Sequence, residues 1–112
     1  MGSLVNGTVV VLNYPFSDLS ASKRRPAVVL GDVGFGDVLV CQVTSQPYTD
    51  RNSVRLDSSD FASGGLAQVS YARSGKLFTA HETLILREAG NLKPAAYDRV
   101  RDAVISFLRA GS

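Results

Sequence analysis

The spacing of apolar residues changes once along this chain, and that change constrains the fold more than any other feature. Up to about residue 90, apolar and β-branched residues form short runs separated by glycines and polar segments, a pattern typical of strands joined by turns. The residues that then follow the spacing of one helix face are Tyr97, Val100, Val104, Phe107 and Leu108. The pattern predicts a single domain over 1–112, with a small, mainly β barrel over about 7–90 and a C-terminal α-helix over about 94–109.

The β part divides into six or seven expected strands. They lie at 8–14, 26–30, 37–43, 53–56, about 65–71 and 76–80, with a short seventh at 84–88. A polar loop over 17–23 precedes the second strand, and a turn with three glycines over 31–36 joins it to the third. Strands joined by a short turn tend to pair as an antiparallel hairpin, so the start of the second should lie beside the end of the third.

Composition limits the kinds of site that the chain can build. Of 112 residues, 45% are hydrophobic, which is enough for one core and argues against disorder. Cys41 and His81 are the single cysteine and histidine, so a four-ligand zinc site or an internal disulfide is not expected. We expect no metal and no cofactor, and a buried free thiol at Cys41.

Charge and the first residues bear on location and partners. The N-terminal residues lack the pattern of a signal peptide and no apolar run approaches a membrane span, so we expect a soluble cytoplasmic protein. The net charge of +2 is mildly basic, which permits a nucleic-acid partner without requiring one.

The first candidate site residue is Arg25, which ends the basic run 23–25 immediately before Pro26. Proline restricts the preceding residue to extended backbone, so Arg25 should be held at the entrance of a strand. The guanidinium group offers a planar fork of donors that suits phosphate oxygens. Alone, the run is better explained as a solvated basic loop beside a strand.

The second candidate is the segment Thr44, Ser45 and Gln46, at the exit of the third expected strand. Hydroxyl and amide groups there can bind phosphate, a 2′-OH or base edges, although such residues also cap strand ends. The expected hairpin brings Thr44 to the same barrel edge as Arg25. A cation and a hydroxyl that converge at a rim form a plausible phosphate-processing pair.

Several further residues could contact RNA. The candidates are Lys23 and Arg24 in the basic run, Tyr14, Phe16 and Tyr48 as stacking rings, and Arg51 and Arg73 as phosphate contacts. Tyr14 and Phe16 could instead lie in the core or a dimer contact, and Arg51 and Arg73 could be ordinary surface residues. His81 lies beyond the last barrel strand and is a weaker candidate for a general base.

These segments resemble a known family. The stretch GTVVVLNYPFSDLSASKRRPAVVL, the later VTSQ and the return segment GGLAQVSYARSGKLFTA are similar to bacterial toxins of the MazF and PemK type. The resemblance implies an SH3-like barrel, a homodimer, an acidic antitoxin partner and sequence-selective cleavage of single-stranded RNA, with Arg25 and Thr44 in catalysis. The chain departs from some members at 20–25, which lacks an acidic residue, and at 74–77, where a more acidic turn is expected.

RNA can be cleaved without a metal-bound water because it carries its own nucleophile, the 2′-OH. The expected products are a 2′,3′-cyclic phosphate and a 5′-hydroxyl, and DNA should not be cut. Two alternatives stay open. One is a CcdB-like poison of DNA gyrase, which the absence of tryptophan disfavours, and the other is a barrel that binds nucleic acid or a partner without catalysis.

Overall fold

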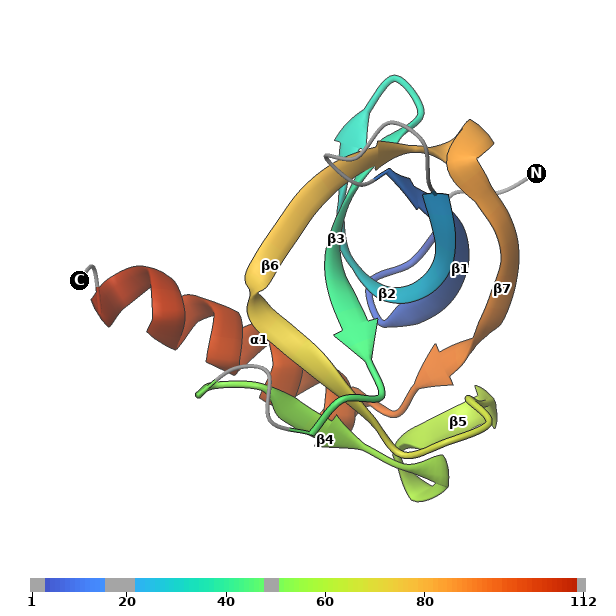
Figure 1. Cartoon of the computed structure of the whole chain (residues 1–112). Helices are drawn as coiled ribbons and strands as arrows, with labels where there is room; N and C mark the ends of the chain where they lie inside the picture. Colours follow the sequence, from blue (N-terminus) through green and yellow to red (C-terminus); the bar gives the residue numbers. More distant parts are fainter. Residues whose placement is uncertain (1–3, 16–21, 48–50, 111–112) are drawn as a thin grey trace.

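The computed structural model describes residues 4–15, 22–47 and 51–110 (Figure 1). Within these residues, seven strands form one antiparallel sheet in the order β4-β6-β3-β2-β1-β7-β5, followed by one α-helix. The elements are β1 (Thr8–Pro15), β2 (Ser22–Gly34), β3 (Asp37–Thr44), β4 (Val54–Leu56), β5 (Phe61–Gly64), β6 (Ser70–His81), β7 (Ile85–Leu92) and α1 (Pro94–Ala110), with short 3₁₀ helices η1 (Ser58–Asp60) and η2 (Glu82–Leu84).

The sheet curls strongly, and α1 packs against β6, β4 and β7 at one end of the curl (Figure 1). The prediction of a mainly β fold with a C-terminal helix is therefore confirmed. None of the helices in the described segments is long and apolar enough to cross a membrane.

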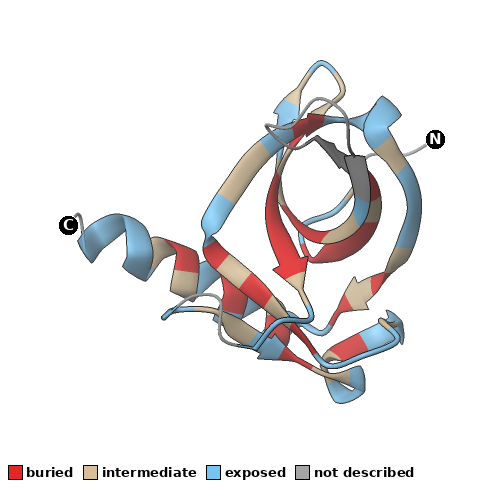
Figure 2. Cartoon of the chain, in the orientation of Figure 1, coloured by how far each residue is buried: buried red, intermediate tan, exposed pale blue. Residues whose placement is uncertain are grey.

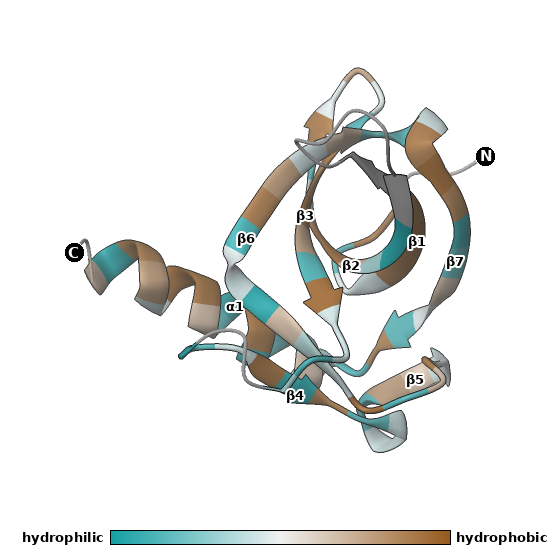
Figure 3. Ribbon diagram, in the orientation of Figure 1, coloured by the Kyte–Doolittle hydropathy of each residue, from teal (hydrophilic) through white to brown (hydrophobic). Residues whose placement is uncertain are grey.

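The strands bury residues on both faces of the sheet, as Figure 2 shows along β3. One face, here called the helix face, carries Cys41, Val43 and Ala72, which form a core cluster with Ala96 and Val100 of α1. The members of the opposite cluster, on what we call the second face, are Val10, Leu12, Ala27, Val29, Val38, Val40 and Ala80. Figure 3 shows the same apolar character along these strands. Residues that pair directly on neighbouring strands point to the same face of the sheet. The strand register therefore assigns each position to the helix face or to the second face.

The buried side of α1 includes fewer residues than its sequence spacing predicts. Val100 and Val104 are buried, but Phe107 and Leu108 are 46% and 63% exposed. The last turns of α1 extend past the sheet (Figure 2), so they have little left to pack against. Phe107 still reaches β6, because a Cβ built on Gly75 would lie 3.1 Å from its ring.

The expected boundaries of the later strands were wrong. A single strand, β6, replaces the two predicted at 65–71 and 76–80, and the short strand β5 lies earlier than the first of them. The sequence around Ser74 is typical of a turn, but it lies within β6 as an irregularity in the pairing with β3. Cys41 pairs with Leu77, whereas Val43 pairs with Ala72, so β6 has extra residues between these two pairs. The hydroxyl of Ser74, within β6, donates to the carbonyl of Asn52 in the turn before β4 at 3.1 Å, so this buried polar side chain has a partner.

Strand β2 is also longer than predicted at both ends. Its first residues, expected in the loop 17–23, pair with β1 as far as Ser22, and its last pair with β3 as far as Gly34. The expected turn 31–36 shrinks to Phe35 and Gly36, because β3 supplies backbone partners for the residues before them.

Candidate functional site

Arg25 and Thr44 lie at the same end of the paired strands β2 and β3. The antiparallel hairpin predicted for these strands is present, with Ala27 opposite Gln42. Arg25 and Thr44 each lie two residues beyond that pair, at the end of the hairpin away from its turn.

The two residues also share the second face of the sheet. Ala27 belongs to the core cluster of that face, and β2 runs without a register shift back to Arg25, which pairs with Leu12 of the same cluster. Val43 belongs to the helix face, so its neighbour Thr44 lies on the second face. A cation and a hydroxyl therefore meet at one end of a single sheet face.

Strands β6 and β4 extend this arrangement across the sheet. Tyr71 pairs with Thr44 on one side and with Arg55 on the other, so all three share the second face. Arg73 lies two residues along β6, and its Nη1 donates to Oε1 of Gln42 at 3.4 Å. We call the resulting set the polar patch; its members are Arg25, Gln42, Thr44, Arg55, Tyr71 and Arg73.

Contacts inside and beside the polar patch restrict several of its side chains. Gln42 is only 5% exposed, so its contact with the half-buried Arg73 is partly shielded from water. Oγ1 of Thr44 accepts a hydrogen bond from the backbone N–H of Gln46 at 3.2 Å. An Arg55 guanidinium nitrogen lies 2.8 Å from Oδ2 of Asp57, which fixes the direction of that cation.

The remaining predicted contacts are spread more widely. Arg24 is exposed beside Arg25, but strand alternation turns it to the helix face. Ser45 and Gln46 are exposed just after β3, and Arg51 is exposed in the turn before β4. The backbones of Tyr14 and Lys23 pair with each other, their side chains lie outside the described part of the chain, and Phe16 and Tyr48 lie outside it entirely.

His81 lies far from the polar patch. It pairs with Asp37 at the opposite end of β3 from Thr44. Its Nδ1 accepts the backbone N–H of Thr83 at 3.2 Å and so caps the short helix η2. This contact gives His81 a structural role.

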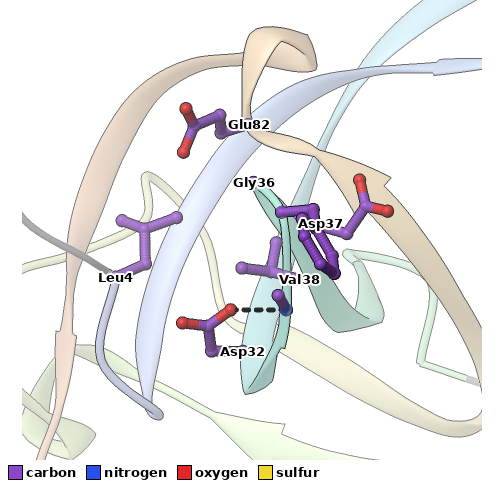
Figure 4. Close-up of a pocket in the computed structure, with 8 residues that line it drawn as sticks. Leu4, Asp32, Gly36, Asp37, Val38 and Glu82 are labelled. Atoms are coloured by element: carbon purple, nitrogen blue, oxygen red, sulfur yellow. Dashed lines mark hydrogen bonds between the residues drawn. The ribbon is translucent and has the colours of Figure 1, made fainter.

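A small hollow of about 130 Å³ lies at the same end as His81 (Figure 4). Its carboxylates come from Asp32, Asp37 and Glu82, and Oδ1 of Asp32 accepts the Gly34 N–H at 2.8 Å. These acids disfavour a phosphate there. Within the residues that the structure describes, no group of three or more His, Cys, Asp or Glu side chains could hold a metal ion.

Sequence reasoning missed Gln42, Tyr71 and Arg55. Gln42 interrupts an apolar run, and a polar residue at a core position is a signal that could have been used. Tyr71 and Arg55 carry no comparable signal, because their relation to Thr44 depends on pairing between strands that are distant in sequence.

Comparison with known proteins gives one family match and several structural matches. The model of the family described as "PemK-like, MazF-like toxin of type II toxin-antitoxin system" matches residues 6–108. No curated protein has a significantly similar sequence.

Among solved structures, the fold is similar to an endoribonuclease from a mycobacterial species in complex with its cognate antitoxin. That match has a TM-score of 0.73 at 15% identity and covers 97% of this chain and 96% of the other. MazF (Form-I) from Deinococcus radiodurans has a TM-score of 0.71 at 21% identity, with 93% and 94% covered. MazE-MazF (Form-II) from the same organism has a TM-score of 0.73 at 19% identity, with 93% and 94% covered.

Proposed function

The chain belongs to the family of PemK-like and MazF-like toxins of type II toxin–antitoxin systems, and from this premise we propose that it is a metal-independent endoribonuclease that cleaves single-stranded RNA. Structurally similar proteins described as endoribonucleases support the proposal. The observation that carries it is the convergence of Arg25 and Thr44 at one end of the second face. The enzyme would act as the growth-inhibiting toxin of its module.

The proposed reaction is a transesterification within the RNA. The 2′-oxygen attacks the adjacent phosphorus, the bond from phosphorus to the 5′-oxygen breaks, and a 2′,3′-cyclic phosphate forms. One proton leaves the 2′-OH and one is delivered to the 5′-oxygen, which departs as a hydroxyl. The phosphoryl oxygens gain charge in between, so groups that stabilise this charge accelerate the step.

Arg25 and Thr44 suit the charge-stabilising part of this reaction. Arginine stays protonated at any ordinary pH, so Arg25 is assigned to the phosphoryl oxygens and not to proton removal. Thr44 already accepts the Gln46 N–H, so its own hydroxyl hydrogen is directed elsewhere and can be donated to a non-bridging oxygen. The side chains that surround the pair on the polar patch are proposed to select the RNA sequence.

The proposal includes partners and a location. The positive charge of Arg25, Arg55 and Arg73 suits an acidic antitoxin segment that covers the polar patch and blocks RNA. The antitoxin-bound similar structures support such a partner. We also propose that the toxin forms one domain over 1–112, works as a homodimer and acts in the cytoplasm, where its RNA is found.

The test is cleavage of a mixed single-stranded RNA by the purified, antitoxin-free protein in EDTA, with the ends mapped. We expect fragments with 5′-hydroxyl ends and no cleavage of the matching DNA. Arg25→Ala should lower the cleavage rate at least ~100-fold, the scale of losing one charge-stabilising donor. Arg24→Ala is the matched control, because it removes the neighbouring cation from the other face.

Failure of the folded wild-type protein to cut any RNA would overturn the proposal. Equal losses of cleavage rate in the Arg25 and Arg24 variants would overturn the assignment of Arg25, because they would show that only the total positive charge matters. Growth arrest with gyrase-linked DNA breaks would identify the alternative, a gyrase poison.

A further inference from the structure

Tyr71 is an aromatic residue that neither core cluster explains. It lies in β6 between two paired strands, with Thr44 directly opposite on β3 and Arg55 directly opposite on β4. Its neighbours in sequence, Ser70 and Ala72, are buried on the other side of the strand. Tyr71 itself is half-buried and belongs to neither hydrophobic cluster.

The surroundings of Tyr71 on the second face are polar and cationic. Its cross-strand partners are a hydroxyl and a guanidinium side chain, and Arg73 follows two residues along the same strand. Aromatic residues pair well in strands in general, and a ring beside an arginine can gain a modest cation–π attraction. Neither effect accounts for a large ring left partly open beside the phosphate-binding pair.

We propose that the ring of Tyr71 stacks on the RNA base next to the phosphate held by Arg25 and Thr44, and so contributes to sequence preference. The inference rests on the proposed function and deepens it. Adjacent strands lie about 4.8 Å apart, so the backbones of Tyr71 and Thr44 are one strand spacing apart, and the ring, on the same face, is within reach of the nucleotide that carries that phosphate. Base–aromatic stacking is a common means of binding single-stranded RNA.

The same geometry sets the path of the RNA. Beyond Tyr71, the next strand presents Arg55, which its ion pair with Asp57 holds in place. A phosphate site, a ring and a second cation then follow one another across β3, β6 and β4. The RNA therefore crosses the strands and does not run along them.

The experiment measures stacking by fluorescence. The probe is a single-stranded RNA analogue that carries 2-aminopurine between uridines, with the 2′-OH of every nucleotide replaced by fluorine so that no nucleophile for cleavage is left. Stacking on a protein ring quenches this base. We expect quenching by the wild type and by Tyr71→Phe, which keeps the ring, and its loss with Tyr71→Leu.

Binding and cleavage give the second readout. Tyr71→Leu should weaken binding of the probe, and raise KM for RNA, about 5- to 150-fold, the range for one lost stacking contact. Its kcat should change much less, because Arg25 and Thr44 stay in place. The matched control is Phe35→Leu, which removes a fully exposed ring from the turn at the far end of β3.

The outcomes separate this inference from the proposed function. If the wild type cuts RNA while Tyr71→Leu quenches and binds as the wild type does, the stacking inference is wrong and the ribonuclease proposal stands. If the wild type quenches the probe, Tyr71→Leu does not, and the wild type cuts no RNA, the ribonuclease proposal is wrong and the stacking inference stands. A loss in Tyr71→Phe as large as in Tyr71→Leu would also overturn stacking, because it would assign the effect to the hydroxyl.

Discussion

Nη1 of Arg73 donates a hydrogen bond to Oε1 of Gln42 at 3.4 Å, and this contact ties β6 to β3 where their regular pairing is interrupted. The thiol of the adjacent Cys41 donates to the Arg73 carbonyl at 3.0 Å. The expected buried free thiol is therefore present at Cys41. Cys41 contacts the backbone of Arg73, and Gln42 orients the side chain of Arg73. The position of the Arg73 cation on the polar patch therefore depends on β3.

We predict that Gln42→Leu and Arg73→Ala each raise KM for RNA severalfold, because each removes the oriented cation. Contacting residues are not additive, so the double variant should resemble the worse single variant. A double-mutant cycle on kcat/KM measures this, and the expected coupling energy equals the loss in the weaker single variant, about 0.5–1 kcal/mol. Full additivity would show that Gln42 does not act through Arg73.

Thr44 permits a sharper test of the proposed chemistry. Thr44→Val keeps the shape but removes the hydroxyl, and we expect kcat to fall about 100-fold, the scale for one hydrogen-bond donor to the reacting oxygens. Thr44→Ser keeps the donor and should lose about tenfold at most. Thr79→Val, the same change at an exposed position of β6 that pairs with Leu39 away from Thr44, is the control. Single-turnover cleavage rates compare the four proteins, and full activity in Thr44→Val would remove this residue from the mechanism.

The sequence predicted the parts of the site that depend on neighbouring segments. Arg25 and Thr44 could be placed at one edge because a short turn joins their strands, and a hairpin leaves little choice of arrangement. Tyr71 and Arg55 could not be placed, because their register with Thr44 is set by long-range pairing and by the irregularity around Ser74. The local pattern there resembled a turn, and tertiary pairing kept it in the strand.

Gly90 gives a prediction about stability. It pairs with Gly64, and a Cβ on Gly90 would overlap the Ser63 carbonyl oxygen. The backbone carbonyl of Ser63 cannot move aside as a flexible side chain could. Gly90→Ala should therefore destabilise the fold by about 1–3 kcal/mol, as overpacking of a core does. Gly65→Ala is the control, since its Cβ would meet nothing within 4 Å. Denaturant unfolding compares them, and equal effects would mean that the close approach of β5 to β7 is unimportant.

Asp57 predicts a pH dependence of stability. The side-chain and backbone hydrogen bonds from Ser59, followed by the contact with Arg55, hold the pKa of its carboxyl below the ordinary value. A lowered pKa means that the charged form stabilises the fold above the ordinary carboxyl pKa of about 4, and that this contribution is lost as pH falls through the lowered value. Asp57→Asn should therefore lower Tm at pH 7, and the difference from wild type should shrink in acid. A difference that is constant down to pH 3 would contradict the prediction.

Arg55 gives a prediction about the salt dependence of binding. Each phosphate contact with single-stranded nucleic acid adds about −0.7 to the slope of log K against log salt, so contacts from Arg25, Arg55 and Arg73 should give about −2. Arg55→Ala should make the slope shallower by about 0.7, because it removes one phosphate contact at the far end of the proposed path. Arg101→Ala is the matched control: Arg101 is also exposed and paired with an acid, Asp98, but it lies on α1. Binding of the uncleavable RNA probe across a salt series measures the slopes. Equal slopes for the two variants would exclude Arg55 from the path, since both remove one positive charge from the protein.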